Sequence, residues 1–160
     1  MTERPNATWQ QAHMGNLHIF WINLNKSKKA HLELMNDRLS SKYKIILIQE
    51  PHTITFNNNI RTPPNFRLVF PSHRTQSQDT IHSVIWVNRS IDTSKWISLD
   101  IPNTNDITAI QLKNTTGVIS IFNIYNDCNH SLNKHLLHTY IRNNQHNILA
   151  TNNHHMIWAV

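Results

Sequence analysis

The chain has 160 residues, with 15 Lys and Arg against 9 Asp and Glu, and this composition excludes several classes of protein. Its length suits one domain and is too short for two independent cores. The isoelectric point near 9.8 favours polyanionic partners, of which nucleic acid is the commonest. The single cysteine, Cys128, excludes an intrachain disulfide and a cysteine zinc cluster. No apolar run reaches the ~20 residues that span a bilayer, so we expect neither secretion nor a membrane partner.

The first predicted elements follow a polar leader. Residues 1–16 show no sustained hydrophobic period, so we treat them as a loose leader and place the domain at 17–160. The apolar runs 17–23 and 44–49 predict two strands that are buried on both faces. Between them, Ser27 can cap a helix that continues to about Ser40. A helix that connects two strands favours a parallel pair and an α/β fold.

The middle of the chain predicts a long loop and then several strands. Residues 51–65 contain three prolines and three consecutive asparagines, so we expect mostly loop there. Strands are predicted at 66–70, 83–88, 96–100, 107–113 and 118–125, with a hairpin turn at 114–117. A second amphipathic helix is predicted at Ser131–Arg142, and one more strand at Asn147–Thr151. These elements predict mixed sheets with helices on the outside.

Polar residues stand at the carboxyl ends of the buried strands, where ligands of α/β sheets tend to bind. They are Asn23, Glu50, Tyr125 and Asn126. A carboxylate in such a place can hold a hard cation such as Mg²⁺. An ordinary strand-end acid that faces solvent is the alternative interpretation of Glu50. Lys26, Lys28 and Lys29 could contact phosphate, or could form a solvated helix start.

Several sequence strings, in their order and spacing, carry a family resemblance. IILIQEPH is preceded by FWINLNKSKKAH and followed by SVIWVN and SIFNIYND. Together they resemble the endonuclease domain of the endonuclease/exonuclease/phosphatase superfamily, in the branch of fungal non-LTR retrotransposons. The resemblance extends from about Leu17 to Trp158. It implies part of a four-layer α/β sandwich, with two mixed sheets flanked by helices and the C-terminal strands missing. It also implies Mg²⁺-dependent (or Mn²⁺-dependent) hydrolysis of phosphodiester bonds in DNA.

The resemblance also implies roles for individual residues. Glu50 matches the principal metal ligand, and Tyr125 matches the tyrosine that reaches the scissile phosphate. Asn23 and Asn152 match catalytic asparagines. Asn25 and Asn126 are the candidate substrate-binding residues. These roles agree with the chemistry, because neutral donors can bind a phosphate without neutralising the carboxylate that holds a metal.

One landmark of the family differs in this sequence. The family has a strand that ends in GDFN and commonly continues as RHHPLWD. Aligning His154, His155 and Trp158 with that continuation places Ala150 at the catalytic aspartate and Ala159 at the later one. A methyl group cannot activate water or bind a metal. We therefore expect no nicking of DNA, and no rescue by Ala150→Asp alone because the terminal Asp-His pair of the family is also missing.

Two other functions remain open. One is a catalytically dead relic that at most binds nucleic acid, and the other is a phosphatase or sphingomyelinase-like member of the superfamily. DNA is the expected partner, bound in a salt-dependent and sequence-independent way, and no obligate protein partner is inferred. The protein is expected to be intracellular, and nuclear if it acts as a retrotransposon enzyme. Zinc binding by His154 and His155 is not favoured, because neighbours on a strand point to opposite faces.

Overall fold

Two four-stranded sheets form the centre of the computed structural model, which describes residues 17–54, 59–75, 80–115, 117–127, 131–148 and 153–160. The first sheet contains β1 (Ile19–Asn23), β2 (Ile45–Gln49), β3 (Phe66–Val69) and β4 (Ser83–Asn88), in the order β1-β2-β4-β3. β1 and β2 are parallel, and β4 runs antiparallel to β2 and β3. The predicted parallel pair is therefore confirmed.

The second sheet has the order β5-β6-β7-β8. Its strands are β5 (Trp96–Leu99), β6 (Ile107–Lys113), β7 (Val118–Ile124) and β8 (His154–Ala159). β6 is antiparallel to β5 and β7, whereas β7 and β8 are parallel. The predicted turn between β6 and β7 is confirmed, and within it the Gly117 N–H donates to Asn114 Oδ1 at 2.7 Å.

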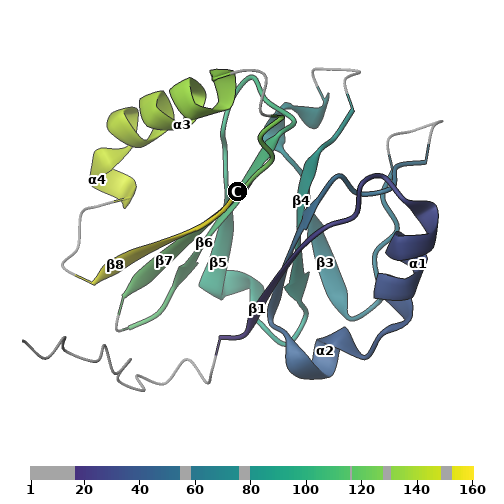
Figure 1. Ribbon diagram of the computed structural model, residues 1–160. Helices are drawn as coiled ribbons and strands as arrows, with labels where there is room; N and C mark the ends of the chain where they lie inside the picture. The colour runs from purple at the N-terminus through teal and green to yellow at the C-terminus, as the bar shows by residue number, and fades with distance from the viewer. Residues whose placement is uncertain (1–16, 55–58, 76–79, 116, 128–130, 149–152) are drawn as a thin grey trace, which may run out of the picture.

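Helices cover the outer face of each sheet (Figure 1). Beside the first sheet lie α1 (Lys28–Asn36) and α2 (Leu39–Lys42), and beside the second lie α3 (Leu132–Asn143) and α4 (Gln145–Ile148). Two short 3₁₀ helices, η1 (Ser72–Thr75) and η2 (Thr93–Lys95), complete the described elements. Ser27 caps α1 as expected, since its hydroxyl accepts from the Ala30 N–H at 3.2 Å. The helix ends earlier than predicted because Asp37 has an extended backbone.

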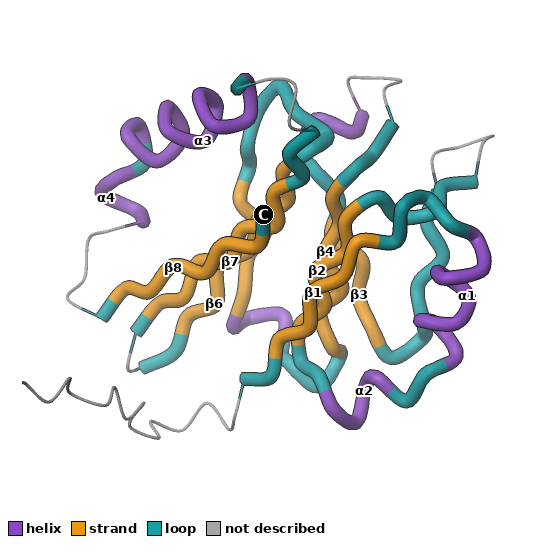
Figure 2. Tube along the Cα trace, in the orientation of Figure 1, coloured by secondary structure: helices purple, strands orange, loops and turns teal. Residues whose placement is uncertain are grey.

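Three apolar clusters hold these layers together. One lies between α1 and the first sheet and includes Leu34, Ile46 and Trp86. The second joins the two sheets through residues such as Leu47 and Ile121. The third packs α3 on the second sheet and is centred on these residues: Ile107, Phe122 and Leu137. The result is the expected α/β sandwich of two mixed sheets flanked by helices, and its layers are visible in Figure 2.

The strand predicted at Asn147–Thr151 is wrong at its first two residues. Gln145–Ile148 is the helix α4, and residues 149–152 lie outside the described part of the chain. The last strand among the described residues is β8, which begins at His154. α4 forms because the Asn147 and Ile148 N–H groups both donate to the Asn144 carbonyl, at 2.9 and 3.0 Å, and Ile148 is buried. An apolar run of this length does not by itself distinguish a buried helical turn from a strand.

Within the described residues, no helix is both long enough and apolar enough to cross a membrane.

Candidate active site

The carboxyl ends of β1 and β2 lie side by side because the two strands are parallel and in register, with Asn23 opposite Gln49. The backbone pairing continues beyond the strands. The Leu24 N–H donates to the Gln49 carbonyl at 2.9 Å, and the Lys26 N–H donates to the Glu50 carbonyl at 2.8 Å. The loop after β1 is therefore fixed to the residue that follows β2.

Backbone strain is concentrated at these strand ends. Asn25, Lys26 and Glu50 have φ values of 48°, 57° and 45°, and none of them is glycine. A left-handed backbone costs a residue with a Cβ atom about 1–2 kcal/mol. Strained residues of this kind persist where the surrounding structure fixes them, and they are frequent at functional sites. The described part of the chain contains one other non-glycine residue with positive φ, Asn103.

Glu50 and Tyr125 meet at this end of the molecule, although they come from different sheets. The Tyr125 phenol lies close enough to the Glu50 carboxylate for the two groups to interact. Burial, followed by the negative charge and the hydrogen bond of Glu50, raises the pKa of the Tyr125 phenol above its usual value. Tyr125 is therefore a protonated donor at neutral pH. Lys26 Nζ also lies 3.9 Å from Glu50 Oε1, and the Glu50 side chain is 14% exposed.

A buried polar network joins the two sheets directly beneath this contact. Gln49 Nε2 donates to the Ile124 carbonyl at 2.8 Å, next to Tyr125. Asn123 Nδ2 donates to the Ile48 and Val84 carbonyls, both at 2.9 Å. Two hydroxyl bonds complete the network, from Ser83 to the Asn123 carbonyl and from Thr108 to the Ser83 carbonyl. The sequence analysis did not select these residues, although a polar side chain within a buried apolar strand was a visible signal.

His82 and Asp106 support Tyr125 from the opposite side. His82 Nδ1 lies 2.7 Å from Asp106 Oδ1, and the His82 ring lies 4.7 Å from the Tyr125 ring between centroids. Backbone bonds of 2.8 Å run from Glu50 N–H to the His82 carbonyl and from Tyr125 N–H to the Asp106 carbonyl. Glu50, His82, Asp106 and Tyr125 thus form a closed ring of contacts. Sequence reasoning also missed this pair, because neither residue belongs to a recognised motif.

Asn133 of α3 completes the support of Asp106. Its Nδ2 donates to Asp106 Oδ2 at 3.0 Å and to the Tyr125 carbonyl at 2.9 Å. Burial favours the neutral form of Asp106, but the hydrogen bonds from His82 and Asn133 outweigh it and lower the pKa of the carboxyl below its usual value. Asp106 is therefore a stable anion that fixes the orientation of His82.

The other residues selected from the sequence differ in exposure, and two of them lie outside the described residues. Asn23 is exposed at the end of β1, and its Oδ1 accepts from the Asn25 N–H at 2.8 Å. Asn25 is exposed as well, and Asn126 is half-buried directly after Tyr125. Asn152 and Ala150 lie outside the described residues. The structure thus brings Asn23, Glu50 and Tyr125 to one end of the sheets.

Ala150, which the sequence aligns with the catalytic aspartate, lies outside the described residues, so this alignment stays a prediction. His154, His155 and Trp158, on which the alignment rests, belong to β8, which pairs with β7 from Val118↔His154 to Asn123↔Ala159.

No family model and no curated protein matches the sequence. Among solved structures, the fold matches the endonuclease domain of TRAS1, a telomere-specific non-LTR retrotransposon, with a TM-score of 0.59 and 21% sequence identity. The fold is endonuclease-like. The match covers 79% of this chain and 53% of that chain, so the present chain spans about half the length of the structure it resembles.

In this endonuclease-like fold, the donor set at the strand ends suits magnesium better than zinc. The described residues contain no group of three or more His, Cys, Asp and Glu side chains that could hold a metal. Glu50 offers one partly exposed carboxylate. Magnesium is often bound through one or two carboxylates together with water and substrate phosphates, whereas a zinc site needs about three or four protein ligands. Glu50 therefore fits Mg²⁺ as a single anchoring ligand.

Proposed function

We propose that this chain forms part of a DNA endonuclease domain that hydrolyses phosphodiester bonds with Mg²⁺ or Mn²⁺ at Glu50. The observation that carries the proposal is the contact between Glu50 and Tyr125, which come from different sheets and meet at the strand ends of an endonuclease-like fold. The strained backbone of Glu50 supports it further. Membership of the endonuclease/exonuclease/phosphatase superfamily is part of the same proposal.

Each residue of the site has a role that follows from its chemistry. Glu50 would anchor the metal, which when bound supplies positive charge to the phosphate oxygens. Tyr125 would donate its phenolic proton in a hydrogen bond to a phosphate oxygen, since its raised pKa keeps the phenol protonated. Lys26, 3.9 Å from Glu50, would place a further positive charge beside the same phosphate. Asn23 would orient the substrate from the end of β1.

A second candidate function is nucleic-acid binding without catalysis. The excess of basic residues favours it, with 15 Lys and Arg against 9 Asp and Glu. Such binding would depend on the release of counterions, and it would need neither Glu50 nor a metal.

Nicking of supercoiled plasmid distinguishes the two functions. We expect residues 1–160 alone not to nick, because Ala150 stands at the aspartate position and the terminal Asp-His pair of the family is missing. In a chain with Ala150→Asp and a family-like C-terminal segment added, we expect nicking only with Mg²⁺ or Mn²⁺, Glu50→Gln to reduce it to background, and Tyr125→Phe to lower it about 100-fold. Glu33→Gln is the matched control, because it removes the same charge from a side chain that is 68% exposed on α1. Nicking that survives Glu50→Gln would overturn the proposal. Salt-dependent DNA binding without nicking by this extended chain would favour the second function.

A further inference from the structure

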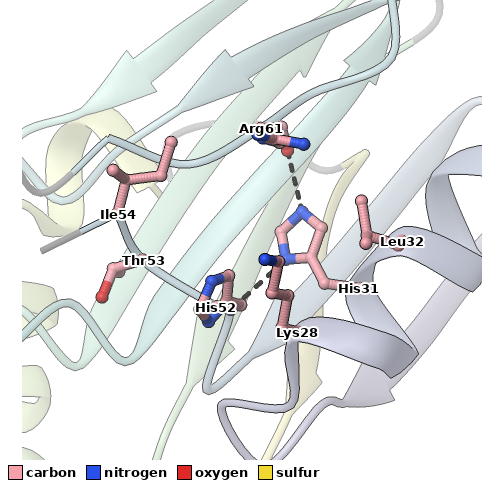
Figure 3. A pocket seen from close by; sticks show the side chains of 7 residues that line it. All are labelled: Lys28, His31, Leu32, His52, Thr53, Ile54 and Arg61. Atoms are coloured by element: carbon pink, nitrogen blue, oxygen red, sulfur yellow. Dashed lines mark hydrogen bonds between the residues drawn. The ribbon is translucent and has the colours of Figure 1, made fainter.

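A small basic pocket lies between α1 and the segment that follows β2. It has a volume of about 220 Å³ and is lined by seven residues (Figure 3). Lys28 and Leu32 come from α1, His52 and Ile54 from the segment after β2, and Arg61 from the returning chain. The lining contains no acidic residue. The pocket therefore suits a small anion, with apolar side chains on part of its wall.

His31, at the base of the pocket, holds its three segments together. The side chain is 2% exposed, and Figure 3 shows its ring between Arg61 and His52. Its Nδ1 accepts from the His52 N–H at 3.3 Å, so its Nε2 carries the proton that is donated to the Arg61 carbonyl at 2.8 Å. The ring also packs edge-on against Trp86, with centroids 5.7 Å apart. These contacts fix the backbone of the basic residues before any ligand arrives.

The pocket lies close to the candidate active site along the chain. His52 is two residues from Glu50, and two residues span at most about 7 Å. Lys28, on the other wall, is two residues from Lys26, which contacts Glu50. The positive charges therefore continue from the strand ends into the pocket.

We propose that this pocket is a second phosphate subsite, which binds a DNA backbone phosphate next to the one at Glu50. The inference rests on the proposed function, because it assumes that DNA reaches Glu50. Lys28 and Arg61 bind the phosphate oxygens, and Leu32 and Ile54 face the adjoining sugar. The pocket is smaller than the ~300–1,000 Å³ typical of drug-sized ligands, which suits one phosphate better than a whole nucleotide. His31 is a positioning residue and does not itself contact the DNA.

The salt dependence of DNA binding tests this subsite. We would compare Lys28→Gln/Arg61→Gln with Lys42→Gln/Lys95→Gln, which removes two charges from exposed residues of α2 and η2, beyond the opposite ends of the strands from Glu50. Binding of a fluorescent DNA duplex is measured by anisotropy at several salt concentrations. The pocket variant should reduce the slope of log K against log salt by about 1, the value for one lost phosphate contact. The control variant should keep the slope of the wild type.

The outcomes separate the subsite from the proposed function. Folding should be unaffected in the pocket variant, since Arg61 contacts His31 through its backbone carbonyl and not through its guanidinium. If the pocket variant and the control have the same slope while nicking depends on Glu50, the subsite is refuted and the endonuclease proposal stands. If wild-type binding does not change with salt, the subsite is refuted as well, whereas the endonuclease proposal is refuted only by nicking that survives Glu50→Gln.

Discussion

His31 shows how one buried side chain can link folding to pH. Burial first, and then the positive charges of His52 and Arg61, lower the pKa of His31 below its usual value of 6.5, although the hydrogen bond to Arg61 opposes this. The unfolded chain therefore binds a proton at a higher pH than the folded chain does. The contribution of His31 to stability is complete above pH 6.5 and declines as the pH falls from there toward the lowered pKa.

We predict that His31→Gln lowers the free energy of unfolding by about 1–3 kcal/mol at pH 7.5, because buried hydrogen bonds are lost. The difference from the wild type should shrink at pH 5, where protonation weakens the wild-type protein. Urea unfolding at both values measures this. His146→Gln makes the same substitution at an exposed residue of α4 and is the control. A difference that is constant between the two pH values would contradict the role given to His31.

At the scale of elements, His154 and Trp158 are residues of β8, where both have structural partners. Its side chains pack on β7, and the Trp158 ring stacks on the Phe122 ring with centroids 5.1 Å apart. His154 Nε2 lies 3.0 Å from Ser120 Oγ, so this histidine is a structural partner within the sheet. The carboxyl end of β8 lies beside that of β7, because the two strands are parallel.

The family resemblance predicts what should follow this segment. The family's GDFN position falls at residues 149–152, and its last strands and terminal Asp-His pair come further along the chain. If the reading frame continues past Val160, we expect an Asp-His pair in the continuation. Sequencing the gene beyond that codon is the measurement. A continuation without such a pair would leave DNA binding as the better proposal.

At the scale of the whole molecule, two edge strands of the described sheets carry exposed apolar side chains. β1 and β8 each pair with one described strand, and Trp21 on β1 and Trp158 on β8 are 47% and 42% exposed. Exposed apolar edge strands are sites where further strands or other chains can add. The open ends of the sheets are thus the surfaces through which this chain would associate.

We predict concentration-dependent self-association, which Trp21→Lys should weaken because a charged edge opposes strand addition. Leu132→Lys is the control, since Leu132 is 61% exposed but lies on α3 and not on a strand. Sedimentation velocity over a range of protein concentrations measures the effect. Equal weakening by both variants would indicate general hydrophobic contact instead of edge pairing.

The sequence alone determined most of the fold and part of the site. Strands β4 and β6 have the predicted bounds, because continuous apolar runs with clear turn residues on both sides leave few alternatives. Ser27 was identified as a helix cap for a similarly local reason. Glu50, Tyr125 and Asn23 were selected because strand ends of an α/β sheet converge, which is a rule that needs no coordinates.

Only the tertiary structure decided the rest, because the deciding partners are far apart in sequence. α4 is stabilised by the burial of its residue Ile148, and β8 is stabilised by pairing with β7. Both interactions override the local sequence pattern. The bonds of Asn123 to strands of the other sheet could not be read from its neighbours. The ring through His82 and Asp106 likewise joins residues 24 positions apart. Periodicity shows which face of an element is buried, but only the packed molecule shows what that face meets.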